Sequence, residues 1–243
     1  MTNPLPGTGG ADREDRDQAR RNTPLAVTSL DRLVSTQDYA DFARTFAGVA
    51  KASATRLSDG QRRVVHLTIA GDDDIQIQPT SDLYRNLIKA LRDFGDPFVP
   101  VQLVMRSLRL LLVEAAVRVR PEYLWEKVEP KIRAAMLDHF SFKNRELGQD
   151  VLLSDVISTI HRVEGVAYTD VNQFDSVDAE GIVSQLSGGD ALSDAIKLRE
   201  RIPVDLARID FTETDASKRI RPAELVYLTP DVADTLVLSE ITS

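Results

Sequence analysis

Twice in this chain a helix-like run is followed by Gly-Val-Ala and then by a strand-like run, and this repetition constrains the fold more than any other feature. The two stretches are "AGVAKASA", residues 47–54, and "EGVAYTDV", residues 164–171. Glycine commonly ends helices because it adopts left-handed backbone angles without strain. The alternation of apolar and polar residues after each glycine is typical of a strand. Each stretch therefore predicts a helix–Gly–strand unit.

The two stretches align at a constant spacing of 117 residues, which is the separation of Gly48 and Gly165. The same spacing pairs Asp38 with Asp155, whereas the apolar helix faces coincide only partly. We interpret the pattern as two related helix-plus-strand units, each completed by a longer strand and a second helix. The alternative is a coincidence between two ordinary helix–Gly–strand transitions.

Capping and terminating residues mark two helices in the first half of the chain. Ser35, with Asp38 three residues later, approximates a capping box before "TQDYADFARTF". Downstream, "PTSDLYRNLIKALRDFG" is the clearest helix, with Thr80 as its predicted cap and Gly95 as its terminator. Its apolar stripe is expected to be buried: Leu83, Leu87, Leu91 and Phe94.

Between these helices, the run "RRVVHLTIAG" carries apolar residues at alternate positions, which predicts a strand. Val65, Leu67 and Ile69 share one face of that strand, and His66 lies on the other. We expect His66 to be a partly exposed strand residue. Residues 101–105 are predicted to form a further strand.

The second half of the sequence reuses these parts in a different order. "SLRLLLVEAAVRVRP" predicts a long strand, "EYLWEKVEPKIRAAMLDHF" a helix that Pro130 kinks or begins, and "LLSDVISTIHRVEGVAYTDV" a helix followed by a strand. After Asp175 the dense apolar pattern fades, and a short helix is expected at 190–199. Two β-prone segments, 224–228 and 235–241, fit either a small hairpin or a strand given to a partner's sheet.

Together these segments predict an α+β fold made of two small related α/β modules, with helices packed on short mixed sheets and an arm at each end. We expect an extended N-terminal arm or linker at 1–30, a first α/β module at 31–105, a second α/β module at 106–175, and a linker with a β-prone C-terminal arm at 176–243. The N-terminal arm is rich in Pro, Gly and charge and has no apolar face. It is therefore expected to gain order only against a partner.

Charge and cysteine content exclude several classes of protein. Asp and Glu number 38 against 30 Lys and Arg, and the net charge of −8 disfavours a general nucleic-acid binder or an anionic-membrane binder, since both need a basic surface. The absence of cysteine removes disulfides and thiolate sites and fits synthesis in a reducing cytoplasm. The start lacks the features of a secretory signal, and the longest apolar run, 108–119, is interrupted by charges and is shorter than the ~20 residues of a spanning helix. A soluble protein is expected.

The sequence shows no constellation of catalytic, cofactor-binding or metal-binding residues. Its three histidines, His66, His139 and His161, lack metal-ligand spacing, so we expect none of them to bind a metal or act as a general base. "GDDD" at 71–74 lacks the spaced ligands of a calcium loop and is expected to be a solvated turn. Phosphate-binding loops and nucleophile elbows are also absent from the sequence. We therefore predict a protein that is not an enzyme and has no cofactor, no metal site and no small-molecule substrate.

Three separated stretches, in order along the chain, carry a family resemblance. The first is "NPLPGTGGAD" with "ARRNTPL" and "LDRLVSTQDYADFARTFAGVAKA"; the second is "RPEYLWEKVEPKIRAAMLDHFSFKNRELGQDVLLSDVISTIHRVEGVAYTDVNQFD"; the third is "RPAELVYLTPDVADTLVLSEI". Together they resemble baseplate J-like proteins, in particular the baseplate assembly proteins of phage tails and of phage-tail-like contractile injection systems. Members of that family usually have a sizeable region before the "NPLP" arm, so we expect this chain to be a C-terminal portion, a split gene product or the result of a start-site choice.

The resemblance implies a structural role in the baseplate wedge, which rings the hub below a contractile tube and sheath. The implied partners are other baseplate subunits, namely a second wedge protein, the hub and sheath-proximal components, together with further copies of this chain. The resemblance implies no nucleic-acid or membrane partner and carries over no catalytic residue. It places the protein in the cytoplasm when made, and then in an assembled tail-like particle or virion.

Two other functions remain open on the sequence alone. A free-standing α+β adaptor would lack genomic neighbours that encode sheath and tube proteins. A tail-associated hydrolase would need carboxylates grouped as an acid–base pair, and the sequence singles out no such pair.

Overall fold

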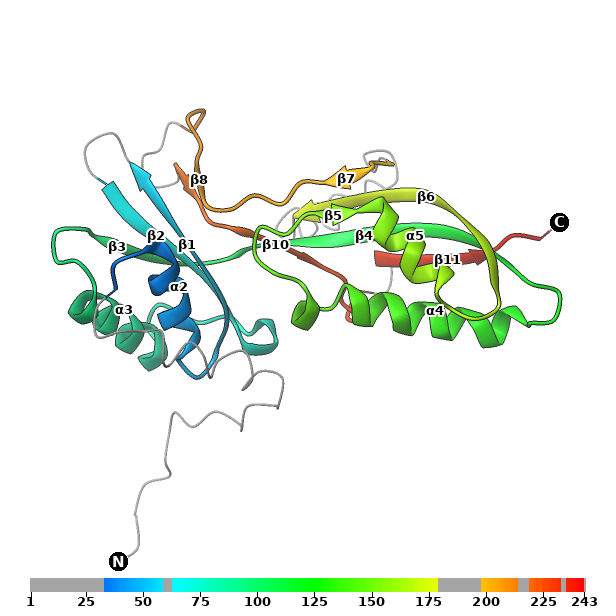
Figure 1. The fold of residues 1–243 in the computed structure, drawn as a ribbon, viewed down its shortest axis with the longest axis horizontal. Coiled ribbons are helices and arrows are strands. Elements are labelled where there is room, and N and C mark those ends of the chain that lie inside the picture. Colours follow the sequence, from blue (N-terminus) through cyan, green and yellow to red (C-terminus); the bar gives the residue numbers. More distant parts are fainter. Residues whose placement is uncertain (1–32, 59–62, 179–197, 214–218, 233–234, 243) are drawn as a thin grey trace, which may run out of the picture. The chain divides into compact units, whose positions relative to one another are not determined.

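The computed structural model describes residues 33–58, 63–178, 198–213, 219–232 and 235–242, which form an α+β fold as predicted (Figure 1). They fall into two compact units. Unit 1 comprises Met1–Arg106 and Leu206–Ala223, and unit 2 comprises Ser107–Asp205 and Glu224–Ser243. The predicted arm at 1–30 and nearly all of the predicted helix at 190–199 lie outside the described residues. The division into four sequence segments stays a prediction.

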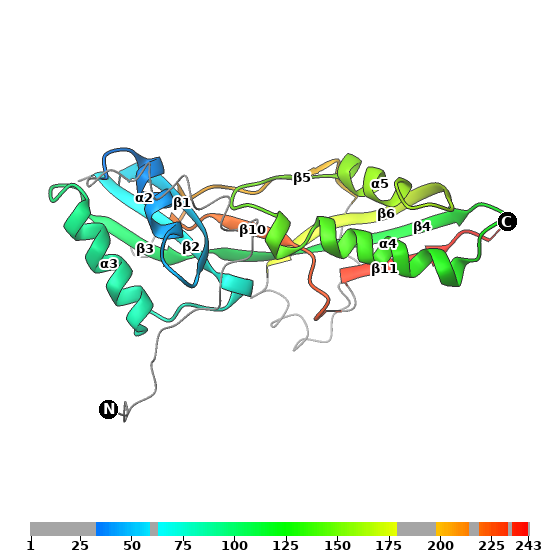
Figure 2. The same ribbon diagram turned by 60° about the horizontal axis from the view of Figure 1, so that its bottom comes forward.

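Unit 1 is a three-stranded sheet with two helices on one face. Strand β2 (Arg63–Gly71) is central, antiparallel to β1 (Val49–Ser58) and parallel to β3 (Val101–Met105). Helices α2 (Thr36–Arg44) and α3 (Asp82–Phe94) pack on this sheet (Figures 1 and 2). The unit is completed by the short helical turn η1 (Asp72–Asp74) and by the paired strands β8 (Arg208–Ile209) and β9 (Ile220–Arg221).

The two helices of unit 1 begin at side-chain caps. The capping box of α2 is confirmed, because Ser35 Oγ accepts a 3.1 Å hydrogen bond from the Asp38 amide and Asp38 Oδ2 accepts a 2.8 Å bond from the Ser35 amide. Helix α3 ends at Gly95 as predicted, but its cap is Ser81, which accepts from the Tyr84 amide, and not Thr80.

The buried stripe of α3 is shorter than the sequence predicts. Leu87 and Leu91 are fully buried against the sheet, and Leu83 is half-buried. Phe94 is 44% exposed, so its predicted burial is wrong. It lies in the last turn of the helix, where its ring contacts Phe42 of α2 with 5.5 Å between centroids.

Unit 2 is built on the predicted long strand, β4 (Ser107–Val119). Strand β6 (Val166–Asp178) pairs antiparallel with one edge of β4. Strands β10 (Glu224–Tyr227) and β11 (Leu236–Glu240) pair with β4 in parallel, β10 at its start and β11 further along. Both β-prone C-terminal segments are therefore strands. For the described residues, the expectations of a hairpin or of a strand lent to a partner are wrong, because both strands pair with β4 of the same chain.

Two helices of unit 2 lie side by side on the β4–β6 sheet (Figure 2). They are α4 (Trp125–His139) and α5 (Leu153–His161). Helix α4 starts five residues before Pro130, so this proline does not begin the helix. The remaining elements of the unit are η2 (Phe142–Asn144), β5 (Val151–Leu152) and β7 (Arg201–Ile202), of which β5 and β7 pair antiparallel.

The repeat predicted from the sequence is present in the backbone. A shift of 117 residues carries the bounds of α2 onto those of α5 and the start of β1 onto the start of β6. The intervening glycines have nearly the same angle, with φ of 94° at Gly48 and 99° at Gly165. Each strand then has a register shift after its first residue, which leaves Ala50 and Ala167 as the extra residues.

The order of the shared parts differs between the two units. Unit 1 runs helix, strand, strand, helix, whereas unit 2 runs strand, helix, helix, strand. In both, the central strand has an antiparallel neighbour on one side and a parallel neighbour on the other. The expectation of two related modules with reordered parts is therefore confirmed, and the coincidence alternative does not explain the matching bulges.

Candidate interaction site

The histidines and carboxylates singled out by the sequence do not gather into a site. His66 lies on β2 of unit 1, and His139 and His161 lie at the ends of two helices of unit 2. Within the described ranges, no three His, Cys, Asp or Glu side chains are placed to hold a metal ion. The helices described in this chain are also too short or too polar to cross a membrane.

His66 is completely buried, so its predicted partial exposure is wrong. It shares a face of β2 with Thr68, which is also fully buried. Residues of the distant segment 206–223 reach this face, where the Ala223 amide donates a 3.0 Å hydrogen bond to Thr68 Oγ1. Neither ring nitrogen of His66 has a hydrogen-bond partner in the described part of the chain. Burial without a partner lowers the pKa of His66 to about 4.

The buried imidazole makes unit 1 sensitive to acid. In the unfolded chain the pKa of His66 is about 6.5, whereas in the folded chain it is about 4. Between these two pH values the imidazole is therefore protonated in the unfolded chain but neutral in the folded chain, and the folded state loses stability as the pH falls. We expect His66 to lower the free energy of unfolding by about 3 kcal/mol between pH 7 and pH 4. Hydrogen exchange of peptides from β2 at a series of pH values measures this.

The matched comparison is His66→Leu, which should flatten that part of the pH dependence, with exposed His139→Gln as the control. Carboxylates titrate in the same range, so the result is the difference between the variant and the parent chain. If the free energy of unfolding of His66→Leu depended on pH as steeply as that of the parent chain, His66 would not be the cause of the acid sensitivity.

The "GDDD" segment is only partly the solvated turn that the sequence predicts. Asp72 and Asp73 are exposed, but Asp74 forms an ion pair with Arg106 in which the side chains are 13% and 6% exposed. Arg106 Nε donates to Asp74 Oδ1 at 2.6 Å. This carboxylate is therefore committed to a structural contact within unit 1.

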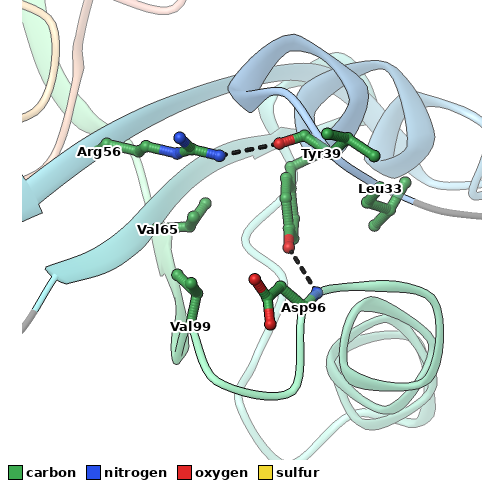
Figure 3. A pocket seen from close by; sticks show the side chains of 7 residues that line it. Leu33, Tyr39, Arg56, Val65, Asp96 and Val99 are labelled. Atoms are coloured by element: carbon green, nitrogen blue, oxygen red, sulfur yellow. Dashed lines mark hydrogen bonds between the residues drawn. The ribbon is translucent and has the colours of Figure 1, made fainter.

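Unit 1 contains a cavity of about 270 Å³ (Figure 3). Its apolar lining consists of Leu33, Val34, Val65 and Val99. Its polar lining consists of Tyr39, Arg56 and Asp96. The cavity is several times larger than the ~30 Å³ share of one water molecule in the liquid, so it can accept a side chain.

Hydrogen bonds hold the polar residues of this cavity in place. Arg56 donates to the Val34 carbonyl at 2.8 Å, and the Tyr39 hydroxyl accepts from the Asp96 amide at 3.1 Å. Asp96 Oδ1 accepts from the Phe98 amide at 2.9 Å. The structure thus presents a charged guanidinium and a charged carboxylate at an apolar cavity.

An exposed aromatic residue is adjacent in the sequence to a residue of the cavity lining. Phe98, two residues after Asp96 and next to Val99, is 92% exposed, and Val34 of the cavity lining is 67% exposed. A cavity with an apolar floor, two charges and an exposed aromatic neighbour is suited to binding a side chain of another protein. Sequence reasoning missed it because its residues come from four separate segments. The sequence feature that could have indicated this cavity is the "DPFVP" loop, residues 96–100, which contributes Asp96 and Val99 to its lining.

A buried arginine in unit 2 also escaped the sequence analysis. Arg145 is 4% exposed, and its guanidinium donates to three backbone carbonyls, those of Val226 at 3.3 Å, Gln149 at 2.6 Å and Asp150 at 2.7 Å. Burial lowers the pKa of Arg145, and the carboxylates of Asp155 and Asp150 oppose that effect. This side chain ties the loop after η2 to strand β10.

Comparison with known proteins identifies one of the two units. Residues 31–104 match the baseplate J-like central domain family, which is less than a third of the chain. No curated protein matches. Among solved structures, a chain in the cryo-EM structure of the anti-feeding prophage (AFP) baseplate, 6-fold symmetrised, is similar at 14% identity with a TM-score of 0.48. That match covers 72% of this chain and 40% of the other, so this chain spans less than half of its length.

The segment at residues 31–104, which lies in unit 1, is similar to the baseplate J-like central domain. This match confirms the resemblance to baseplate J-like proteins that the sequence carries.

Proposed function

We propose that this chain is a structural component of the baseplate wedge of a contractile phage-tail-like particle. In this role it makes subunit–subunit contacts in the baseplate ring and links the ring to the sheath, without catalysing a reaction. The observation that carries the proposal is the match of residues 31–104 to the baseplate J-like central domain. The proposed partners are a second wedge protein, the hub, sheath-proximal subunits and further copies of this chain.

Two features of the structure support an assembly role. Unit 1 exposes large apolar side chains, including Phe98 at 92%, Phe211 at 87% and Ile75 at 68%. Two of these residues are aromatic, and aromatic side chains are enriched in the surfaces that other proteins cover. The two units also repeat one helix–Gly–strand motif, so the chain offers two related modules for contacts with neighbouring subunits.

Deleting the gene for this chain tests the proposal. We expect the deletion strain to yield tubes and sheaths without baseplates, because a ring that lacks a wedge component cannot close. Electron microscopy of purified particles is the measurement, and the chain supplied from a plasmid should restore baseplates. A plasmid with exposed His161→Gln is the matched control and should restore them equally.

Location within the particle separates a wedge role from other baseplate roles. A cryo-EM map of restored particles should place the chain in the ring around the hub and in contact with the sheath-proximal layer. Intact baseplates in the deletion strain, or density for this chain outside the ring, would refute the wedge assignment.

A further inference from the structure

A late excursion of the chain adds residues to unit 1. The chain passes from unit 2 to unit 1 after Asp205 and back again before Glu224. The base of this excursion is closed within unit 2, where the Glu224 amide donates to the Asp205 carbonyl at 2.9 Å and the Asp205 amide donates to Glu224 Oε2 at 3.2 Å. We call residues 206–213 and 219–223 the strap.

The strap reaches the face of the β1–β2–β3 sheet that holds His66 and Thr68. Its Ala223 amide donates to Thr68 Oγ1 at 3.0 Å, and its strand β8 lies against β1. Both His66 and Thr68 are 0% exposed, and neither ring nitrogen of His66 has a hydrogen-bond partner among the described residues. A proton on this ring would therefore create a buried charge with neither water nor a partner, which is a costly arrangement.

The sheet supplies no counter-charge next to His66. The residues opposite it are neutral, namely Thr55 on β1 and Gln102 on β3. Helices α2 and α3 pack on the other face, against Val65 and its apolar neighbours. Charged side chains of the sheet lie further along the His66 face: Lys51, which is opposite Ala70, and Arg106, which follows β3 and is paired with Asp74.

The strap does not supply a counter-charge for His66 either. Its charged side chains are Arg208, Asp210, Glu213, Arg219 and Arg221. None of them hydrogen-bonds to the imidazole. Asp210 accepts hydrogen bonds from Thr212 and Arg221, which lower its pKa to about 2. Its charge therefore stays constant between pH 7 and pH 4, and it does not titrate together with His66.

The strap can leave the sheet at a lower cost than the sheet can unfold. Strands β8 and β9 pair with each other and belong to a separate two-stranded sheet. The strap side chains that are buried most completely are small, those of Ala207 and Ala223 at 4% and 0% exposed. Its larger apolar side chains are partly buried or exposed and belong to neither hydrophobic core: Leu206, Ile209, Phe211 and Ile220. Release of the strap therefore exposes much less apolar surface than loss of the helix-covered core.

We propose that the strap is an acid-released cover of the unit 1 sheet, in which protonation of His66 favours the state with the strap undocked and the imidazole hydrated. Because the base at Asp205 and Glu224 stays closed, the undocked strap remains tethered at both ends and docks again when the proton is lost. This inference goes beyond the wedge role and does not depend on it.

The direction and size of the effect follow from the two states of the ring. With the strap docked, burial lowers the pKa of His66 to about 4, whereas a hydrated imidazole has a pKa of about 6.5. Protons therefore bind the undocked state more tightly, and docking weakens as the pH falls below about 6.5. Between pH 7 and pH 5 the equilibrium constant for undocking should rise about twentyfold.

Hydrogen exchange of the full chain at pH 7 and pH 5 tests this inference, after correction for the intrinsic exchange rate at each pH. The Ala223 amide is the most direct reporter, because its hydrogen bond to Thr68 is broken on undocking. Its corrected exchange should be about twentyfold faster at pH 5. Amides of β2 should exchange more slowly than Ala223 at both pH values, because the sheet stays folded when the strap undocks.

Two variants separate the proton from the hydrogen bond. His66→Leu should abolish the twentyfold rise, whereas exposed His139→Gln, the matched control, should retain it. Thr68→Val removes the acceptor of the Ala223 amide and leaves His66 in place. Undocking should then be favoured about tenfold more at both pH values, with the ratio between them unchanged. Peptides from residues 206–213 report undocking in this variant.

Three results would overturn the inference. They are corrected exchange of Ala223 that is equal at pH 7 and pH 5, equal protection of Ala223 and β2 at both pH values, and an undiminished ratio in His66→Leu. The wedge role is tested separately, by baseplates in the deletion strain and by the position of the chain in particles. Particles that contain the chain in the ring would therefore retain the proposed function even if the strap proved insensitive to acid.

Discussion

Replacing Arg145 with alanine is expected to lower the free energy of unfolding of unit 2 by about 4 kcal/mol. The substitution removes a charged donor that is itself 4% exposed, together with its hydrogen bonds to the carbonyls of Gln149, Asp150 and Val226. Hydrogen bonds from a charged group contribute roughly 1.5–3 kcal/mol each, and a buried carbonyl such as that of Val226 costs about 1–3 kcal/mol when it loses its donor, so the expected sum is large for one residue.

The sole tryptophan of the chain makes this measurement local. Trp125 begins α4 and packs against the core of unit 2, so its fluorescence during urea unfolding reports that unit. Arg145→Lys keeps the charge but loses the planar fork, and it should cost about half as much as alanine. Exposed Arg162→Ala is the control and should be nearly neutral. A loss below about 1 kcal/mol in Arg145→Ala would mean that the three carbonyl contacts do not form in solution.

Gly165→Ala should also destabilise unit 2 by about 4 kcal/mol, for two independent reasons. Gly165 has φ of 99°, where an L side chain is strained by about 1–2 kcal/mol. A methyl group at this position would lie 2.8 Å from Tyr123 Cγ and 3.0 Å from Val128 Cγ2, and such overpacking costs a further 1–3 kcal/mol or so. Trp125 fluorescence again gives the result.

The internal repeat supplies the matched comparison for this variant. Gly48 has φ of 94°, but a methyl group there meets only Leu83 Cδ2 at 3.1 Å, at the flexible end of a side chain. Gly48→Ala should therefore cost unit 1 only about 2 kcal/mol, as measured by hydrogen exchange of β1 and β2. Equal costs at the two glycines would show that backbone strain alone sets the penalty and that the Tyr123 contact is unimportant.

Local sequence patterns predicted the parts of the fold that neighbouring residues determine. The capping box of Ser35 and Asp38 and the terminator Gly95 have the predicted role, because each acts within about four residues of itself. The repeated glycines have the left-handed backbone angles expected of them, but they lie in the turn before each strand, three residues after the helix caps Thr45 and Arg162. In the structure, the spacing of 117 residues also relates the starts of α2 and α5 and of β1 and β6. Local patterns do not predict which strands pair when they are far apart in the sequence, as β10 and β11 are from β4.

The misplaced residues share one physical cause, which is contact with a distant segment. The alternation of apolar and polar residues in β2 predicted that one face of the strand is exposed to solvent. That face holds His66 and Thr68 and is buried, because residues beyond 205 reach it. Arg145 belongs to a polar loop in the sequence and is buried because β10, some eighty residues later, supplies one of its carbonyl partners. The cavity of unit 1 likewise needs segments that meet only in the folded chain.

The late arrival of residues 206–223 has a consequence for how this protein is made. Those residues follow the matched segment 31–104 by more than 100 positions, and the Ala223 amide supplies the hydrogen bond to Thr68. On the ribosome, the nascent sheet therefore has an unfinished side until residue 223 has been translated. A recombinant fragment that stops at Arg106 lacks the residues that cover this side, so residues up to 106 do not by themselves make the whole of unit 1.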